Sequence, residues 1–490
     1  MGMTDRGFGF VPNWGQSNTA PTRTNEKAYF PVSISATVRE ATFSETLAGI
    51  LNADPSHDIE TDLKESFMAL DELNGKEETA DELWNAFLAS YGVSAEGFGN
   101  STDEVDYIVP FHRAVATSLE IDQRQWWRLY WLLMTDPEDG VAEEIHEEFV
   151  EALYNTPASN LLEKLTINAI QDMDGIDLSS TPEDELSEDS YHEIPPLVPG
   201  CAKAFREDIK AWLDLQNAES TSKWMLGLRD IVSFHYMMYV IQVAVTLDEE
   251  YANIDDGSPY DYTFRMKPIP FGLATEQASQ SREFVQVWQG DGISRALYDS
   301  WGRLAIMSKL VDIGMAEETS VESKPYTLTE ALDVFPEDLQ EQVVTALFDE
   351  FPEEQRPDDE YDLPEAAVRF SHSVRRYYEN MGRTPSSQTA YSAGENSVRD
   401  LGRGTDRQYI ERRRGVGTIL RLDRGSLRLF ARLFDATKER GHIDEFWEYM
   451  RQRGIKFDRR SKQTLIQQLE GMGLLQKQSD SGEAMYVETV

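Results

Sequence analysis

The sequence contains very little cysteine, lysine and histidine. Cys201 is the single cysteine among 490 residues, so the chain can form neither an internal disulfide nor a zinc knuckle. We expect Cys201 to be a small, buried, apolar side chain. The seven histidines are scattered, and no Ser/His/Asp or Cys/His set can be nominated from their positions. We therefore expect no catalytic residue, no resident metal and no cofactor in this chain.

The sequence also lacks an apolar run long enough to cross a bilayer. The longest run, residues 231–247, includes His235 and Gln242 and is shorter than the roughly 20 residues that a membrane helix needs. It is typical of a buried core helix. Residues 1–30 lack the charged-then-apolar pattern of a signal peptide and are expected to form a loose arm. These features predict a cytoplasmic protein with no membrane partner.

Two kinds of enzyme site are poorly supported by the sequence. No Gly-x4-Gly-Lys-Ser/Thr phosphate loop occurs, so ATP hydrolysis by a Walker mechanism is not expected. A metal-dependent nuclease needs clustered carboxylates and a lysine, and the nearest arrangement is Asp312 with Glu322 and Lys324. With 88 acidic residues in the chain, such a combination is expected by chance. A nuclease is therefore the least favoured function.

Acidic residues dominate the charge of the protein. The chain has 88 Asp and Glu against 46 Lys and Arg, a net charge of −42, while 40% of its residues are apolar. An acidic DNA-mimicking or cation-binding surface is one interpretation, and adaptation to a cytosol of molar salt is the other. Only 14 of the basic residues are lysine, and the acids are spread from Asp58 to Asp362. This pattern favours a halophilic protein.

Basic residues are concentrated in the last quarter of the chain. Residues 1–365 carry 23 basic and 72 acidic side chains, whereas residues 366–490 carry 23 basic and 16 acidic ones. A basic segment on an acidic protein indicates an anionic partner, and DNA is the commonest. Arg412, Arg413 and Arg414 lie in a glycine-interrupted segment that could follow DNA phosphates. The same arginines could instead pair with the acidic body, and the sequence leaves both readings open.

The periodicity of apolar residues predicts a mainly α, multi-domain helical body with a winged-helix module at the C-terminus. Strand-like alternation is scarce outside the last fifteen residues. Changes in composition predict the following regions: 1–25, flexible arm; 26–175, acidic helical domain; 176–199, linker; 200–351, second helical domain; 352–365, linker; 366–424, Arg-rich connecting segment; 425–490, winged-helix module.

The predicted winged helix rests on three short amphipathic helices followed by a hairpin. Gly441, Gly454 and Gly473 end the three helices, and Asp458 is a candidate N-cap of the third. Residues 474–478 and 483–489, joined by the turn 479–482, read as a β-hairpin. In a winged helix the third helix enters the major groove of DNA and the wing contacts phosphates. Such modules also serve as plain protein-interaction domains.

Six side chains of this module are candidate DNA contacts. Arginine and lysine can pair with phosphate or guanine, and glutamine with the edge of adenine. The candidates on the third helix and the wing are Arg459, Arg460, Lys462, Gln463, Gln467 and Lys477.

The C-terminal residues resemble a known family. The strings GIKFDRRSK (residues 454–462) and LLQKQSDSGEAMYV (residues 474–487) are similar to the C-terminal signature of DptG-type proteins, components of DNA phosphorothioation-dependent restriction systems. The family often has Gly-Asp where this chain has Gly482-Glu483. The resemblance covers about 65 residues. It implies a role in anti-phage defence beside partner ATPase or translocase subunits, and it carries over no active-site residue.

Three functions are therefore weighed. The leading expectation is an accessory, DNA-binding subunit of a restriction complex, without catalytic activity of its own. The alternative is a winged-helix transcription or chromosome-associated regulator, and a nuclease comes last. Phosphate contacts weaken steeply as salt rises, so a binder in a salt-rich cytosol gains from the avidity of a complex. That argument favours the subunit.

Overall fold

The computed structural model describes residues 39–53, 56–93, 105–120, 126–179, 195–218, 220–255, 264–289, 292–314, 327–349, 362–380, 385–403, 407–438, 441–477 and 485–488. The expected arm, the turn 479–482 and the nuclease candidates Glu322 and Lys324 lie outside these residues, as does the side chain of Asp312. Most of each predicted linker also lies outside them. Helices predominate in the described chain, which confirms the mainly α class.

One long helix forms the axis of the fold. Helix α10 (Thr221–Asp255) is 35 residues long, and every residue from 231 to 244 is buried. A helix that is buried on all sides lies in the middle of a core. By length and composition α10 could cross a membrane, yet 94% of its apolar window is buried inside the protein. The expected core helix is confirmed and extends beyond the predicted run at both ends.

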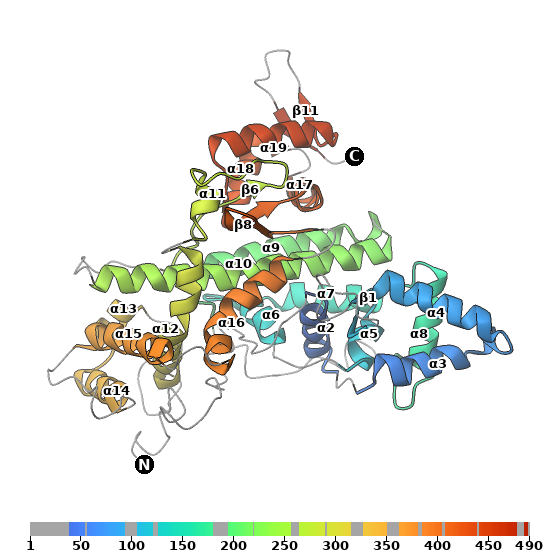
Figure 1. The fold of residues 1–490 in the computed structure, drawn as a ribbon, viewed down its shortest axis with the longest axis horizontal. Helices are drawn as coiled ribbons and strands as arrows, with labels where there is room; N and C mark the ends of the chain where they lie inside the picture. Colours follow the sequence, from blue (N-terminus) through green and yellow to red (C-terminus); the bar gives the residue numbers. More distant parts are fainter. Residues whose placement is uncertain are drawn as a thin grey trace.

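The main core surrounds this axis. Helix α9 (Pro199–Asp214) runs alongside α10 across the centre of the molecule (Figure 1), and Cys201 on α9 is buried as expected. Phe234 of α10 meets Phe430 in an edge-on contact with ring centroids 4.8 Å apart, which joins the axis to the C-terminal region. The helices in contact with α10 or α9 are α2 (Arg39–Ile50), α6 (Trp127–Met134), α7 (Glu143–Tyr154), α9 (Pro199–Asp214), α12 (Ile293–Gly314), α15 (Leu363–Asn380), α16 (Pro385–Gly402) and α17 (Arg424–Lys438).

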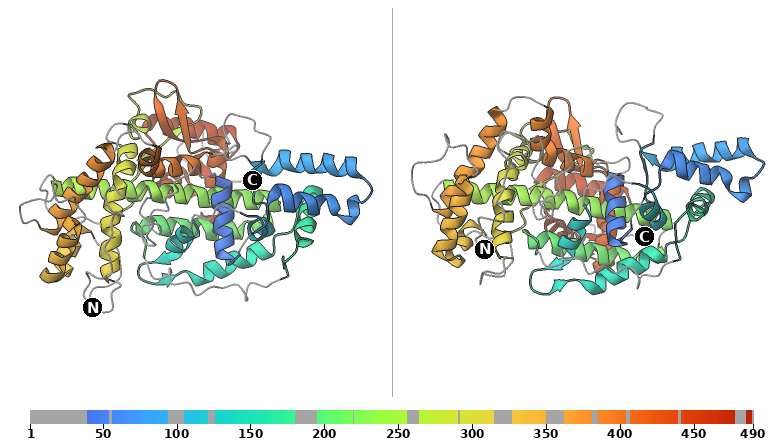
Figure 2. Two further views of the ribbon diagram at one scale, coloured as in Figure 1. Left: turned by 60° about the horizontal axis from the view of Figure 1, so that its bottom comes forward. Right: turned by 90° about the horizontal axis from the view of Figure 1, so that it is seen from below.

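Two smaller cores flank the axis at its ends (Figures 1 and 2). One end carries a projecting N-terminal lobe, where Phe67, Trp84 and Phe87 stack together with ring centroids 5.3–6.4 Å apart. Its elements are η2 (Ile59–Leu63), α3 (Lys64–Ala69), η3 (Asp71–Leu73), α4 (Glu77–Tyr91), α5 (Arg113–Ser118) and α8 (Leu161–Gln171). At the other end α13 (Leu328–Val334), α14 (Glu337–Asp349) and α15 pack near the end of α10.

Short strands join distant parts of the chain. Strand β5 (Ile269–Pro270) pairs in parallel with β10 (Ile455–Lys456), and β6 (Gly272–Leu273) pairs in parallel with β8 (Gly417–Leu422). The remaining short pairs are β1 (Gly92–Val93) with β2 (Tyr107–Ile108), and β3 (Thr135–Asp136) with β4 (Gly140–Val141). Residues 264–289, which include α11 (Glu283–Gln286), therefore connect the Arg-rich segment to the C-terminal region.

The Arg-rich segment contains a β-hairpin that the sequence did not predict. Strand β7 (Ile410–Arg413) pairs antiparallel with β8, and Gly415 and Gly417 at the turn have positive φ angles of 84° and 83°. Strands are scarce outside the last fifteen residues, as expected, but this hairpin is one of the exceptions. Most side chains of β8 are buried, so its sequence lacks the polar–apolar alternation by which a half-exposed strand is recognised.

The C-terminal region has the expected three helices and hairpin, together with a short strand in each connection between the helices. Helices α17, α18 (Ile443–Arg451) and α19 (Arg459–Gly471) precede β11 (Leu475–Lys477) and β12 (Met485–Val487), which pair antiparallel. Strand β9 (Gly441–His442), between α17 and α18, adds to the other edge of β12. The sheet order is β11-β12-β9. Leucines and phenylalanines of this region belong to the main core.

A buried charge cluster ties the N-terminal helix to the segment after α16. The carboxylate of Asp230 on α10 accepts hydrogen bonds from Arg39 of α2, from Arg229 and from Arg407. Arg39 also donates to the carbonyl of Leu401, 362 positions away, at 2.8 and 3.1 Å. Burial favours a neutral Asp230, but the three arginines outweigh it and lower the pKa of this carboxyl. This cluster therefore joins α2, near the start of the described chain, to α10 and to the residues around the end of α16.

Candidate nucleic-acid interface

The first turn of α19 is fixed by a cap. Asp458 has an extended backbone, and its Oδ1 accepts hydrogen bonds from the backbone N–H groups of Arg460 and Ser461 at 2.9 and 2.8 Å. These bonds satisfy donors that a helix N-terminus leaves unpaired. Gly473, with a φ of 73°, follows the end of the helix. The cap and the glycine stop predicted from the sequence are confirmed.

A second residue holds this cap in place. Arg282 donates to both carboxylate oxygens of Asp458, at 2.9 and 3.0 Å, and to the hydroxyl of Ser461 at 2.9 Å. Burial alone would raise the pKa of Asp458, but the hydrogen bonds from Arg282 and the backbone of Ser461 outweigh it and lower that pKa. The start of α19 is thus anchored to the loop before α11.

Glu276 connects this anchor to the β7–β8 hairpin. Its side chain accepts from Ser461 Oγ at 2.8 Å and from Arg282 Nη2 at 2.8 Å. Its backbone carbonyl accepts from Arg413 Nη1 at 2.7 Å. The hairpin and the N-terminus of α19, about 50 residues apart in sequence, are therefore held against a common residue.

The outward face of α19 carries side chains without protein partners. Arg459, Arg460, Gln463 and Gln467 are all exposed. Within the described part of the chain, these four side chains have no hydrogen-bond or ion-pair partner, in a protein with many surplus carboxylates. Helix α19 lies on the outer side of the C-terminal region, away from α10 (Figure 1). This face is free to meet an anionic ligand.

Two further candidates are already engaged by neighbours. Lys462 is half-buried, and its Nζ lies 5.2 Å from the centre of the Trp447 ring. Lys477 on β11 pairs with Glu470 of α19 at 2.6 Å, and both side chains are largely exposed. Exposed ion pairs contribute little free energy, so Lys477 can exchange this carboxylate for a phosphate at small cost.

The arginines of the Arg-rich segment divide into two groups. Arg413 is a structural residue, since it donates to Glu411 at 2.8 Å and to the carbonyls of Glu276 and Ala274. Arg412 and Arg414 on either side of it are exposed and have no partner among the described residues. The structure therefore shows an internal role for Arg413 and leaves Arg412 and Arg414 as candidates for an external ligand.

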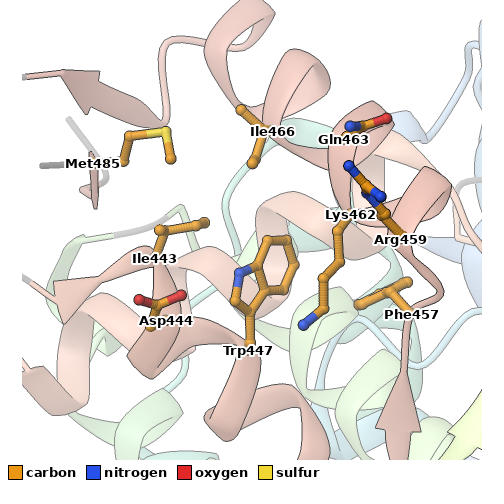
Figure 3. Close-up of a pocket in the computed structure, with 9 residues that line it drawn as sticks. All are labelled: Ile443, Asp444, Trp447, Phe457, Arg459, Lys462, Gln463, Ile466 and Met485. Carbon is orange, nitrogen blue, oxygen red and sulfur yellow. The ribbon is translucent and has the colours of Figure 1, made fainter. Parts of the chain in front are cut away.

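A hollow lies between α18, α19 and β12 (Figure 3). Its volume is about 420 Å³. Trp447 stands at its centre, and Lys462, Arg459 and Gln463 lie together on one side of it. Ile443, Asp444, Phe457, Ile466 and Met485 complete the lining. The hollow combines an aromatic and aliphatic surface with a cationic rim.

The C-terminal region is fixed to the body by a buried carboxylate on α9. Asp208 accepts from Nε of Arg453 at 2.9 Å, from the hydroxyl of Tyr449 at 2.8 Å and from Nε2 of His235 at 2.9 Å. Burial opposes ionisation of Asp208, but Arg453 outweighs it and lowers the pKa to about 2. Burial lowers the pKa of His235, which keeps the ring neutral. The region is therefore joined to α9 and α10 by buried polar contacts.

The described residues contain no group of three or more His, Cys, Asp or Glu side chains that could hold a metal ion. A scan against models of protein families found no match. No curated protein matches the chain either.

Several parts of this site were not foreseen from sequence. Arg282 and Glu276 lie about 180 residues before α19, and their position depends on two parallel strand pairs between distant segments. Trp447 packs against the main core and also lines the hollow. One signal was available: Trp447 is placed one turn after Ile443 and next to a buried Phe446.

Proposed function

We propose that residues 424–488 form a winged-helix module that binds DNA. The order of elements supports this: three helices, a strand between the first and second, and a hairpin after the third, with strand order β11-β12-β9. Strand β10, between the second and third helices, pairs with β5 outside the module. In such modules the third helix reads the major groove and the hairpin follows the backbone. Helix α19 and the β11–β12 hairpin take these roles in the proposal.

The unpartnered face of α19 is the observation that carries the proposal. Arg459 and Arg460 keep their charges exposed although the protein carries 42 excess negative charges. Exposed arginines next to glutamines offer contacts to phosphates and to base edges. Arg412 and Arg414 on the nearby hairpin would extend the contact along the DNA backbone.

We further propose that the protein works as an accessory subunit of a DNA restriction complex. The resemblance of residues 454–462 and 474–487 to the DptG-type signature supports this context. In such a complex, ATPase or translocase subunits supply the motor, and the acidic helical body of this protein provides the surface on which they dock. An acidic surface also suits a salt-rich cytosol, where the avidity of a complex compensates for weakened phosphate contacts.

Charge reversal on α19 tests the DNA interface. The variant R459E/R460E is compared with K64E/K164E, which has the same change in net charge on exposed residues of the N-terminal lobe. Binding of a labelled duplex is measured by fluorescence anisotropy over a series of salt concentrations. We expect R459E/R460E to weaken binding at least tenfold and to lower the salt slope by about two, because each phosphate contact contributes roughly one. Equal binding by the two variants would remove α19 from the interface.

Affinity purification from a high-salt host tests the complex. Recovery of an ATPase or translocase in near-equal amount supports the restriction subunit. Recovery of the protein alone, together with preference for one operator sequence, would favour the winged-helix regulator instead.

A further inference from the structure

The hollow beside α19 has the chemistry of a site for a single unpaired base. We propose that it takes one nucleobase of DNA out of the stack, together with the phosphate next to it. This inference rests on the proposed DNA-binding function and adds the kind of DNA that the module prefers: duplex with an unpaired base or a single-stranded end. The argument has three steps, which concern the floor, the rim and the position of the hollow.

The floor of the hollow is flat, aromatic and partly open. Trp447 is only partly buried, although it packs against the main core. Phe457 meets it edge-on, with ring centroids 6.0 Å apart, and Nζ of Lys462 lies 5.2 Å from the centre of the indole ring. Proteins that bind unpaired bases stack them on such aromatic side chains, and the stacking tolerates any base.

The rim supplies cations and an amide. Arg459 and Lys462 have no carboxylate partner in the described chain, and Gln463 presents an amide that can bond to a base edge. The carboxylate of Asp444 also lines the hollow, but it lies on the other side of Trp447 from Lys462 and Arg459 (Figure 3). The cations point to a ligand with negative charge, which a nucleotide phosphate provides and an apolar peptide does not.

The position of the hollow joins it to the duplex interface. Arg459 and Gln463 belong both to its rim and to the exposed face of α19, and Met485 on the opposite side comes from β12 of the hairpin (Figure 3). A duplex on α19 would therefore run past the opening. A base leaving the stack there would reach Trp447 without a change in the fold of the module.

The test compares DNA substrates on the full-length protein. Three labelled DNAs of the same sequence are used: a fully paired duplex, the duplex with one unpaired base, and the duplex with a single-stranded extension. The readout is the ratio of dissociation constants for paired and unpaired DNA. We expect a ratio of about ten for the wild type, as one stacked base provides. The W447A variant should have a ratio near one, and W447F should retain part of the preference.

Covalent capture gives a readout that does not depend on affinity. A 5-iodouracil at the unpaired position should, on irradiation, crosslink to the peptide that contains Trp447. The control DNA carries the same base within the paired region. Tighter binding of the duplex with one unpaired base would identify an extruded base as the ligand. Tighter binding of the duplex with the single-stranded extension would identify a strand end.

The outcomes separate the two proposals. Firm duplex binding with a ratio of one in the wild type would overturn the pocket and leave the DNA-binding function in place. Absence of binding to all three DNAs would overturn the DNA-binding function itself. A ratio that is unchanged in both W447A and W447F would place the preference elsewhere and refute the site at Trp447.

Discussion

Arg453 and Asp208 form a buried ion pair between residues 245 positions apart. Nε of Arg453 lies 2.9 Å from both carboxylate oxygens of Asp208, and both side chains are almost fully buried. The guanidinium also lies over the ring of Tyr449, with its carbon 3.4 Å from the ring centre. This pair decides how α18 is seated on α9, and hence how α19 is presented.

Removing the charge of Asp208 should destabilise the protein strongly. The variant D208N leaves Arg453 buried without its main partner, and breaking one side of a buried pair costs about 3–5 kcal/mol. Glu207, 3.4 Å away but partly exposed, compensates only in part. The free energy of unfolding is measured by urea titration at constant salt. The control variant E448Q breaks an exposed ion pair with Arg451 and should change the free energy of unfolding by less than about 0.5 kcal/mol. An equal effect of the two variants would contradict this account.

Glu250 should make the stability of the protein fall as pH rises. Burial raises the pKa of this carboxyl to about 8, and one of its oxygens has no hydrogen-bond partner, while the other accepts from the N–H of Leu328 at 2.6 Å. The folded state therefore holds a proton that the unfolded state releases above pH about 4.5. Between pH 4.5 and 8, Glu250 alone should reduce the free energy of unfolding by about 1.4 kcal/mol per pH unit.

The variant E250Q checks this prediction because it cannot ionise. Urea unfolding from pH 5 to 9 should show a smaller decline for E250Q than for the wild type, with the largest difference at high pH. E337Q, an exposed glutamate on α14, is the matched control and should follow the wild type. Parallel pH curves for wild type and E250Q would show that Glu250 titrates normally in the folded protein.

The arginines of the hairpin should separate into stability and binding residues. R413A removes two hydrogen bonds to the loop that holds α19 and one to Glu411 of its own strand, so we expect a loss of about 1–3 kcal/mol in the free energy of unfolding. R412A/R414A should leave this free energy unchanged and lower the salt slope of DNA binding by up to about two. Thermal unfolding and anisotropy on the same preparations measure both effects. If R413A were instead as stable as the wild type and bound DNA weakly, Arg413 would be a binding residue and the prediction would be wrong.

Gly454 should resist substitution because backbone and neighbours both require it. Its φ is 75°, and an added Cβ would lie 2.8 Å from Cε of Met238 and 2.9 Å from Nε2 of Gln242. G473A has nearly the same φ but open space around it, so it should cost only the backbone strain of about 1–2 kcal/mol. We expect G454A to cost more than G473A in urea unfolding. Equal costs would mean that Met238 and Gln242 move aside freely.

Local signals in the sequence were sufficient to predict the helices and the hairpin of the C-terminal region. They were insufficient to predict which distant segments pack against these elements. Asp458, Gly454 and Gly473 act within a few residues of their own positions, so α18, α19 and the hairpin could be predicted from capping and periodicity. The parallel pairing of Ile269 with Ile455 depends on segments 186 positions apart. No local pattern encodes such a pairing, or that of Gly272 with Arg421, and the partners of Arg413 at Ala274 and Glu276 could not be assigned without them.

The same limit applies to the exposed arginines. Arg412, Arg413 and Arg414 are chemically identical in the sequence, yet only Arg413 is aimed at the carbonyls of Ala274 and Glu276. Alternation along strand β7 separates Arg413 from Arg412, and Arg414 lies in the turn that follows, but neither distinction can be made before the strand is known. The structure of the hairpin, and not the composition of the segment, distinguishes the structural Arg413 from the exposed Arg412 and Arg414.

The hydrogen bonds from Arg39 to Leu401 have a consequence for synthesis on the ribosome. Helix α2 emerges early, but the carbonyl that it binds is made 362 residues later. At about 5–20 residues per second, this delay is roughly 20–70 seconds. During that time the apolar side of α2 lacks its final neighbours, and a nascent chain of this protein would depend on chaperones or on its own acidic surface to stay dispersed.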